Sequence, residues 1–304
     1  MLKKEDYFKR IDSSEQNSEF IAMEAKSFAR DVWERFRTNK RALAGLIVLG
    51  AVILIAAIGP VISPYPYDGM DTAIRNQGGS LPHPMGTDQF GRDLLTRVMY
   101  GTRISLMIGF VSTLINLVIG VIYGGIAGYV GGRPDMWMMR VVDVIYAIPN
   151  LLYIILIMLL FGANVGSIML GICISGWVGL ARIVRTQIIS LKEQEFSLVA
   201  FVLGAGPFRI LFKHLMINSL GPIIVTVTLM IPQAIFMEAF LSFIGIGISA
   251  PMASLGTLAQ DAKTYLEVYP MQMLYPVLVI SIIIFALNFI GEGLSAALNP
   301  KGRR

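Results

Sequence analysis

One acidic residue stands alone in a long apolar part of the sequence. Glu238 separates two uncharged stretches, 215–237 and 239–260. An acid in such a setting is a functional hypothesis by default, because burying an unpaired carboxylate away from water is costly. Glu238 could bind a cationic group of a ligand. Alternatively, it lies near the end of an apolar segment or pairs with a neighbouring subunit, and the sequence leaves these alternatives open.

The other groups that could carry chemistry are scattered. His83 and His214 fall in separate parts of the chain, and the 17 methionines spread through apolar stretches, where methionine is usually a core residue. A phosphate-binding loop needs Gly-Lys-Ser/Thr, but Lys26 and Lys263, which precede Ser and Thr, each follow Ala. No nucleophile–base arrangement is visible. We therefore expect no catalytic residue, metal site or cofactor in this chain, and any energy must come from a partner or an ion gradient.

The composition indicates a membrane protein. Charged residues make up 15% of the 304 residues and hydrophobic residues 55%, and the mean hydropathy is +0.67. Soluble domains carry roughly 25% charged residues. The apolar residues also come in long uncharged runs, as membrane spans do. An ordinary soluble enzyme is therefore excluded, and the net charge of +5 concerns topology and lipid headgroups before nucleic acid.

The uncharged runs predict an all-α membrane protein with six transmembrane helices. A helix of about 20 residues crosses the hydrocarbon core. The run 144–181 is too long for one span, and the Gly- and Asn-containing segment 161–166 predicts a turn inside it. The stretch 239–260, with its glycines and Pro251, is expected to be an exit loop. The runs that predict spans are 43–62, 104–132, 144–181 (two helices), 215–237 and 268–291.

The positions of Lys and Arg predict the orientation. If both termini are cytoplasmic and six spans alternate, 20 of the 25 basic residues fall in cytoplasmic segments and 5 in extracytoplasmic loops. Cytoplasmic loops carry the excess of Lys and Arg, so this division favours both termini inside. Residues 1–42 lack a short apolar signal region, and the first span is expected to stay as an anchor. Residues 24–40 are expected to form an amphipathic helix along the membrane surface.

The predicted cytoplasmic loop 182–220 contains signals for a helix–corner–helix unit. Ser197 could cap a short helix that runs to Leu203. Gly204 suits the left-handed residue that ends a helix, and Pro207 suits the first turn of the next. We call residues 195–214 the knob. Because it exposes apolar side chains such as Phe201, it either docks onto a protein partner or lies on lipid, and physical reasoning alone leaves both open.

Two further features each have a functional and a structural interpretation. Gly120, Gly124, Gly128 and Gly132 recur every four residues on one helix face, which allows close helix approach. They could form a sliding or pore-lining contact, or simply pack tightly. The outer loop 63–103 could form a short helix, capped by Thr87 or Asp88, that meets an extracytoplasmic partner, or it could pack onto the top of the bundle. The charged residues that carry these alternatives are Asp88, Arg92, Asp93 and Arg97.

Several motifs in a fixed order resemble a known family. The stretch 83–106, HPMGTDQFGRDLLTRVMYGTRISL, is similar to the hallmark that precedes the second helix in the second permease subunit of dipeptide/oligopeptide (and nickel) ABC uptake systems. The segments that resemble the rest of this subunit are 131–143, 176–185, 191–196, 238–247 and 291–300. The resemblance covers residues 30–302. It implies the type I ABC importer (MetI-like) permease fold.

The loop resembles the Glu-Ala-Ala…Gly signature of such permeases, with departures. The signature Glu falls at Leu198 and the first Ala at Val199, and the Pro before the final Asn is Ile217, whereas Ala200, Gly204 and Asn218 are kept. The acid usual near the end of the last helix is Glu292 rather than Asp. The resemblance implies that residues of this loop couple the permease to an ATPase, namely Glu195, Phe196, Leu198, Ala200, Phe201, Gly204, Ala205, Gly206, Arg209, His214 and Asn218.

The resemblance also implies partners and a division of the chain. The partners are a homologous permease, two cytoplasmic ATPase subunits that hold ATP and Mg, an extracytoplasmic peptide-binding protein and membrane lipid. Glu238, Gly124 and Gly128 are candidates for the translocation path, and Glu238 could contact a peptide N-terminus. The division is a cytoplasmic segment (1–42), the first span with its outer loop (43–101), the permease core (102–291) and a cytoplasmic tail (292–304).

The expected function is import of di- or oligopeptides across the cytoplasmic membrane. Nickel import by the same architecture is the near alternative. A secondary transporter driven by an ion gradient is a second alternative, and it would need ionisable residues in several spans and an inverted repeat. A membrane scaffold that transports nothing is a third, in which the knob would have no ATPase to receive it.

Overall fold

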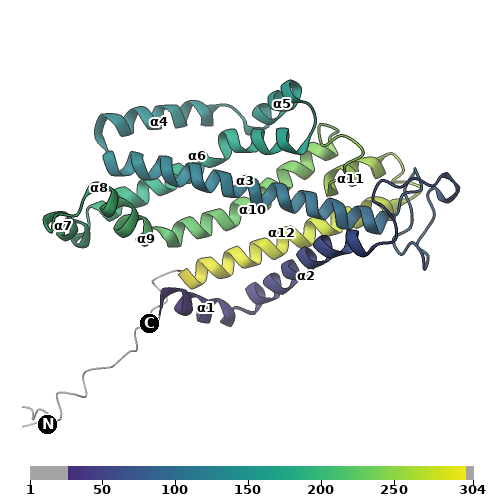
Figure 1. Ribbon diagram of the computed structural model, residues 1–304, viewed down its shortest axis with the longest axis horizontal. Helices are drawn as coiled ribbons and strands as arrows, with labels where there is room; N and C mark the ends of the chain where they lie inside the picture. Colours follow the sequence, from purple (N-terminus) through teal and green to yellow (C-terminus); the bar gives the residue numbers. More distant parts are fainter. Residues whose placement is uncertain (1–26, 299–304) are drawn as a thin grey trace, which may run out of the picture.

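A bundle of long helices forms the body of the protein (Figure 1). The computed structural model describes residues 27–298, and over that range its only strand-like feature is the bridge between Thr87 and Asp93. The helices are α1 (Phe28–Thr38), α2 (Lys40–Ile62), the 3₁₀ turn η3 (Thr72–Ile74), α3 (Leu94–Val130), α4 (Gly132–Ala147), α5 (Asn150–Phe161), α6 (Val165–Lys192), α7 (Glu195–Val202), α8 (Pro207–Arg209), the π-helical turn η4 (Ile210–Leu215), α9 (Met216–Asn218), α10 (Leu220–Phe243), α11 (Leu255–Lys263) and α12 (Pro270–Leu298).

Five of these helices, α2, α3, α6, α10 and α12, are long and apolar enough to cross a membrane. The sixth candidate is the pair α4 and α5, which pass the same test together but are bent by 77° at the break. Pro149 lies in that break, where its ring and missing N–H end the helix. The expected six spans are therefore present in the described residues when the bent pair counts as one, but the third span is broken rather than straight.

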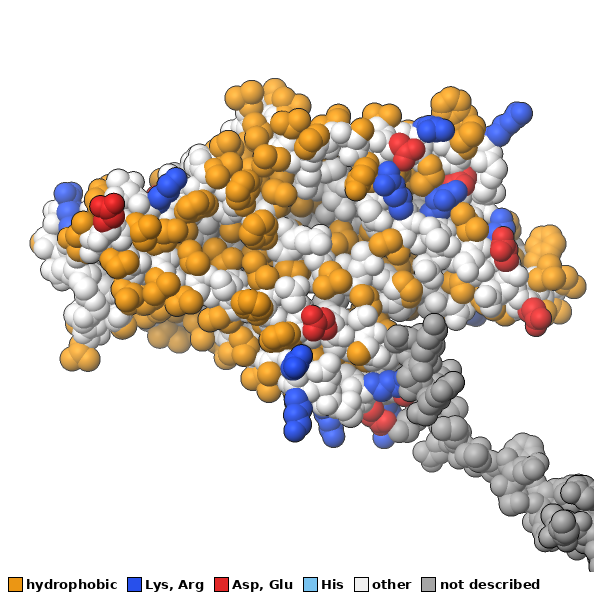
Figure 2. Space-filling view, turned by 180° about the vertical axis from the view of Figure 1, so that it is seen from behind, with side chains coloured by type: hydrophobic (Ala, Val, Ile, Leu, Met, Phe, Trp, Pro, Cys, Tyr) orange, Lys and Arg blue, Asp and Glu red, His pale blue; other side chains and the backbone are white. Residues whose placement is uncertain are grey.

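Burial separates central helices from peripheral ones. About half of the apolar window is buried in α3 and α6, against 22% in α2, α10 and α12. The exposed apolar faces of the peripheral helices suit contact with lipid or with another membrane subunit. Hydrophobic side chains cover the middle of the face in Figure 2, whereas charged side chains gather toward its ends and around α1. This is the surface of a membrane protein.

The two ends of the bundle carry different structures. The knob, α1 and the C-terminal end of α12 lie at one end, and the loop 63–93 with α11 lies at the other (Figure 1). Helix α1 and the C-terminal end of α12 therefore lie at the same end of the bundle as the knob. Of the predicted N-terminal helix 24–40, the structure has a helix over Phe28–Thr38, where Phe36 packs with Ala42 and Ala297, and its place along the membrane surface stays a prediction. Residues 24–26 of that prediction lie outside the described residues.

Three predicted boundaries differ from the ends of the helices in the structure. The second span starts at Leu94, ten residues before the uncharged run, so α3 contains Arg97 and Arg103. Helix α3 accepts these cations because other parts of the chain pair them, and Arg103 donates to the carbonyl oxygens of Ala56 and Ala57 at 3.1 and 2.8 Å. The proposed division at 101/102 falls inside this helix. The expected exit loop 239–260 also includes helical ends, because α10 runs to Phe243 and α11 starts at Leu255.

Candidate functional site

The knob is a short helix followed by a sharp corner. Helix α7 begins after Gln194, so the prediction that Ser197 caps it is wrong, and Ser197 is instead buried within the helix. Gly204 ends it with φ = +82°, a left-handed conformation that costs most other residues about 1–2 kcal/mol. Pro207 takes the first position of α8, as predicted. The corner is closed by hydrogen bonds from Gly204 N to Phe201 O and from Ala205 N to Ala200 O, at 2.9 and 3.0 Å.

The knob is anchored to the bundle on one side. Ile210, Leu211 and Leu215 are buried against Val184 and Ile188 of α6. The π-helical turn η4 carries these anchors and continues through α9 into α10 with only Ser219 between α9 and α10. The knob is therefore joined to a membrane-spanning helix by packed side chains and by nearly continuous helical backbone.

The other side of the knob exposes an apolar surface that no other part of residues 27–298 covers. Leu203, Phe208 and Val202 are 81%, 79% and 76% exposed. Phe208 also stacks on Phe212, with ring centroids 6.3 Å apart. Contiguous exposed apolar surface of this kind marks an interaction site. The remaining exposed apolar residues of α7 are Phe196, Leu198, Val199 and Phe201.

The predicted coupling residues fall into two groups. The residues from Glu195 to Arg209 lie at the tip, where all are exposed except Ser197 and the partly buried Ala200 and Ala205. His214 and Asn218 lie at the base of the knob, and Asn218 Nδ2 donates to His214 O at 2.6 Å. The structure therefore places the tip residues where a partner can reach them, and the two base residues where the knob joins α10.

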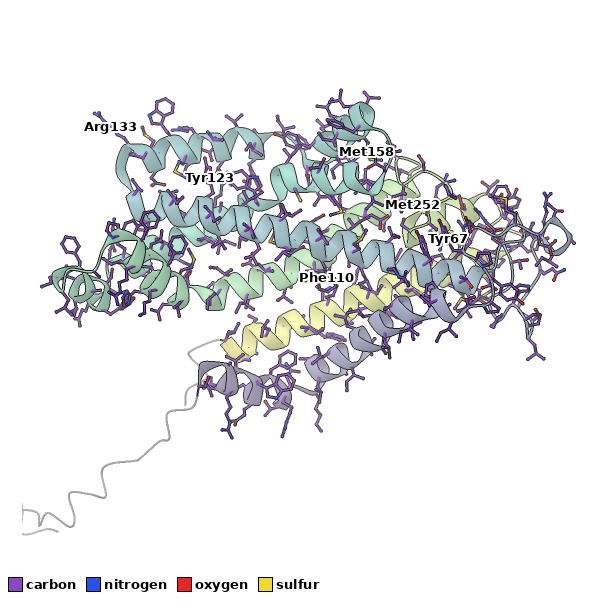
Figure 3. The ribbon with its side chains drawn as sticks, viewed as in Figure 1. Tyr67, Phe110, Tyr123, Arg133, Met158 and Met252 are labelled. Carbon is purple, nitrogen blue, oxygen red and sulfur yellow. The ribbon has the colours of Figure 1, made fainter. Side chains whose placement is uncertain are left out.

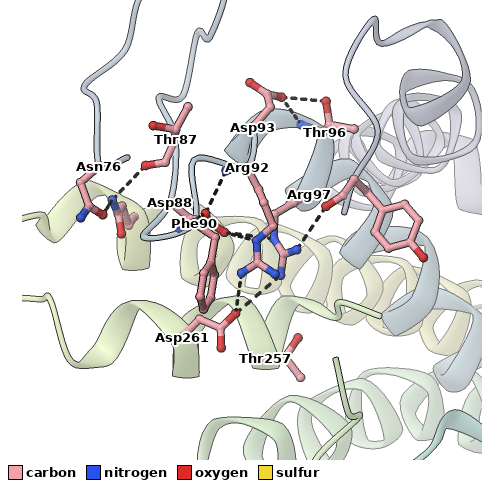
Figure 4. Close-up of polar contacts among 12 residues, drawn as sticks. Asn76, Thr87, Asp88, Phe90, Arg92, Asp93, Thr96, Arg97, Thr257 and Asp261 are labelled. Atoms are coloured by element: carbon pink, nitrogen blue, oxygen red, sulfur yellow. Dashed lines mark hydrogen bonds and ion pairs between the residues drawn. The ribbon is translucent and has the colours of Figure 1, made fainter. Parts of the chain in front are cut away.

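The four charged residues predicted for the outer loop form a buried cluster at the opposite end (Figure 4). Arg92 Nε donates to Asp88 Oδ2 at 2.6 Å, and Arg97 Nε lies 3.6 Å from the same oxygen. Both arginines reach Asp261 of α11 at 3.5 Å. Asp93 caps α3, accepting a 2.7 Å hydrogen bond from Thr96 N, and also pairs with His83. Burial raises the pKa of Asp261, and the nearby Arg97 and Arg92 partly oppose that shift.

This cluster fastens the outer loop to the bundle. Asp88, Arg92, Asp93 and Arg97 are each 6% exposed or less. Their charges are paired with other residues of this chain, and their side chains are buried. Both observations favour packing of the loop onto the bundle over direct contact with an extracytoplasmic partner. The expected short helix headed by Thr87 or Asp88 is wrong, since Thr87 bridges to Asp93 and the helix begins at Leu94. Sequence reasoning missed Asp261, which is about 170 residues from Arg92 and has no local motif.

Glu238 lies in a cage of serines rather than on an accessible surface. It is fully buried in α10. Ser105 of α3 donates to one carboxylate oxygen at 2.8 Å, and Ser242 donates to the other at 2.9 Å. Ser254, the cap of α11, lies 3.5 Å from the Ser242 hydroxyl. Glu238 therefore joins three helices, and in this conformation the structure gives it no face toward a translocation path.

We expect Glu238→Ala to destabilise the protein, because it leaves two buried hydroxyls without their acceptor, at about 1–3 kcal/mol each. Glu238→Gln keeps the size and one acceptor oxygen and should lose less. Thermal unfolding of the detergent-purified proteins measures both. Unchanged unfolding of the alanine variant, together with altered cargo selectivity, would instead place Glu238 in the path.

The glycine repeat packs α3 against α6. A β-carbon added at Gly124 would lie 2.3 Å from the carbonyl oxygen of Ala181, and one at Gly128 would lie 2.7 Å from that of Arg185. At Gly120 the nearest atoms belong to Leu180 at 3.1 Å, whereas Gly132 starts α4 and faces open space. Gly124 and Gly128 thus serve close packing within the chain, and this geometry favours packing over a pore-lining role.

Gly124→Ala should therefore cost about 1–3 kcal/mol through overpacking. Gly179→Ala on α6 is the matched control, because a β-carbon there meets no atom within 4 Å. The yield of folded protein and its unfolding temperature in detergent compare the two. Equal behaviour of both variants would contradict close packing at Gly124.

Charged pairs also hold α4 on α6. Arg185 makes two 2.5 Å hydrogen bonds to Asp135, and Arg182 Nη2 donates to Asp143 at 3.0 Å. The predicted pair of Arg140 and Asp143 is present at 3.8 Å. Tyr123 of α3 reaches into the space between α3 and α4 (Figure 3) and donates to Met138 O at 2.9 Å. The first half of the broken span is thereby fixed to the central helices.

The fold and its projecting knob define a multi-pass membrane permease. Residues 117–304 match the family described as binding-protein-dependent transport system inner membrane component, and residues 27–79 match the N-terminal transmembrane domain of oligopeptide transport permease C. The chain belongs to this family of binding-protein-dependent ABC permeases, in its dipeptide and oligopeptide permease C branch.

Relatives align over nearly the whole chain. The dipeptide transport system permease protein DppC of Bacillus subtilis is 43% identical, over 99% of this chain and 94% of that protein. The oligopeptide transport system permease protein OppC of Escherichia coli K12 is 39% identical, over 97% and 98%. An inward-facing structure of the MetNI methionine ABC transporter shares the fold, with a TM-score of 0.55 and 18% identity, over 68% of this chain and 96% of that chain.

Proposed function

We propose that this chain is the pore-forming subunit of an ATP-driven importer of dipeptides or oligopeptides. The observation that carries the proposal is the exposed apolar knob, anchored to α6 and continuous with α10, in a chain whose relatives are named as peptide transport permeases. ATP and Mg belong to two partner ATPase subunits, and each permease of a pair presents one knob to one ATPase.

In this proposal the knob transmits force. The apolar tip inserts into the ATPase, and burial of each large apolar side chain contributes about 1.5–3 kcal/mol. The Gly204–Pro207 corner fixes the angle of α7, and the buried anchors of η4 carry the displacement toward α10. Alternate opening of the pore to the two sides then follows closure and reopening of the ATPase pair.

The proposal includes an orientation and further partners. Both termini and the knob are cytoplasmic in this proposal, which agrees with the distribution of Lys and Arg and with the end of the bundle that α1, the C-terminal end of α12 and the knob share. The location is the cytoplasmic membrane. A homologous permease completes the pore, and an extracytoplasmic binding protein delivers peptide to the end that carries the loop 63–93 and α11.

Two of the alternatives are less well supported. The relatives compared above are named for dipeptides and oligopeptides, which favours peptides over nickel. An ion-gradient transporter needs several ionisable groups deep in its spans. Glu238 accepts hydrogen bonds from two serines, and the cations of α3 and α6 pair with carboxylates or backbone oxygens near the ends of the bundle.

Purification in mild detergent from the native host, followed by reconstitution into liposomes, tests the proposal. We expect a second permease and two ATPase subunits to co-purify, and labelled peptide to enter only with ATP and the binding protein. Accumulation of Ni²⁺ without peptide would move the assignment to nickel. A lone chain that retains no ATPase after crosslinking would contradict the importer.

A further inference from the structure

A cavity of about 330 Å³ opens between α3, α5, α6 and α10. Its lining includes Thr113 and Asn116 of α3, Asn150 at the start of α5 and Gln233 of α10. Gln233 is the fourteenth of the 24 residues of α10, so the cavity lies near the middle of that span. Its volume falls at the lower end of the range for small-molecule sites, about 300–1,000 Å³.

The polar atoms of this cavity are incompletely satisfied. Asn116 and Thr113 are 3% and 2% exposed, yet Asn116 Oδ1 and Thr113 Oγ1 have no hydrogen-bond partner in the structure. A buried polar group without a partner costs about 1–3 kcal/mol. Asn150 Oδ1 accepts a hydrogen bond from the Ser175 hydroxyl at 2.8 Å. The two N–H donors of the Asn150 amide take no part in that bond. Such groups in the middle of a span point to a ligand that supplies the missing bonds.

The backbone around the cavity is shaped to make room. Asn150 follows the Pro149 break, and Gln233 follows Pro232 inside α10. The break lies between α4 and α5, whereas α10 is continuous through Pro232, and broken helices at membrane depth are tolerated where they line a cavity. Position 176 of α6 also needs glycine, because a β-carbon there would lie 2.3 Å from Asn116 Nδ2. Glycine at 176 thus leaves the space that the Asn116 amide occupies.

The lining contains amides, a hydroxyl and apolar groups but no Asp, Glu, Lys or Arg. A neutral lining does not discriminate between positively and negatively charged ligands. Amide and hydroxyl groups match the hydrogen-bond donors and acceptors of a peptide main chain, which every peptide shares. Met230 and Met237 add flexible apolar surface that adapts to different side chains.

We propose that this cavity binds the main chain of a translocating peptide, with Asn116, Thr113 and Gln233 hydrogen-bonding its amide groups. The inference rests on the proposed function of peptide import and adds the site and its mode of recognition. Glu238, one residue beyond the cavity-lining Met237, has its carboxylate in the serine cage and takes no part. This point of the path therefore does not distinguish positive from negative peptide side chains.

The test uses the purified complex in liposomes, with ATP inside and loaded binding protein outside. Three labelled tripeptides with a central Ala, Glu or Lys are compared, together with the alanine peptide N-methylated at each amide in turn. Asn116→Leu should lower uptake kcat/KM about 2- to 10-fold for all three peptides, as loss of one hydrogen bond predicts. For at least one N-methylated peptide, the ratio of uptake kcat/KM between the parent and Asn116→Leu should be smaller than for the unmethylated peptide.

Two further variants separate binding from folding. Gly176→Ala keeps every polar group but crowds Asn116, and it should lower uptake in the same uniform way. Thr226→Val, on α10 and outside the cavity lining, should leave uptake and complex recovery unchanged. Unchanged uptake in both Asn116→Leu and Gly176→Ala, or a loss confined to one side-chain type, would overturn main-chain recognition. Absence of peptide uptake by the parent complex would overturn the proposed function itself.

Discussion

Gly204→Arg should reduce peptide uptake at least tenfold while the permease still reaches the membrane. The residue at 204 has φ = +82°, so arginine would either hold a left-handed backbone at about 1–2 kcal/mol or open the corner and turn α7. A β-carbon at this position meets no atom within 4 Å, so the bundle itself has no reason to misfold. The long cation projects instead into the proposed ATPase interface.

Uptake and ATP hydrolysis by the reconstituted complex measure this effect separately. We expect hydrolysis that no longer responds to the loaded binding protein, because the knob no longer transmits the signal. Gly204→Asn is the matched control, since asparagine tolerates the left-handed conformation, and it should keep most of the uptake. Normal uptake by the arginine variant at normal membrane levels would contradict coupling through the corner.

Arg97→Met should cost about 3–5 kcal/mol of stability, because it removes one partner from a buried charge network. The side chain is 2% exposed, ion-pairs with Asp88 and Asp261, and donates to Tyr67 O at 3.2 Å. Methionine fills similar volume, so the loss is mainly electrostatic. The observable results are a lower unfolding temperature in detergent and faster proteolysis within the loop 63–93.

Two controls identify the cause. Arg75→Met removes the same charge from an exposed position on the same loop and should change stability by about 0.5 kcal/mol or less. Adding Asp261→Asn to the Arg97 variant removes a carboxylate that has lost a partner and should recover part of the stability. If the exposed and buried arginine variants unfold alike, the cluster does not fasten the loop.

The sequence predicted features that depend on neighbours along the chain. The spans follow from uncharged runs, and the corner of the knob follows from Gly204 and Pro207, because both signals are local. The start of α3 could not be predicted from local signals. Its first turns contain Arg97 and Arg103, and the groups that pair with these cations lie on other segments of the chain.

Long-range pairing also limited the prediction of sites. Glu238 was identified as unusual, but its partner Ser105 is 133 residues away and carries no distinguishing pattern. The glycine repeat predicted close packing, but only the structure shows that its partner is α6. The cavity around Asn116 was missed because single amides in separate helices have no motif.

The most direct test of the central claim is photo-crosslinking from the tip of the knob in native membranes. The chain has a single cysteine, Cys173, which is buried, so a new cysteine can be labelled selectively. Leu203→Cys, at a site 81% exposed, carries the crosslinker, and Leu81→Cys on the outer loop, at a fully exposed site, is the control. Mass spectrometry of the adducts should identify an ATPase subunit for the first and none for the second. Adducts to lipid alone from the knob, or labelling of the knob by an impermeant reagent in intact cells, would contradict the account.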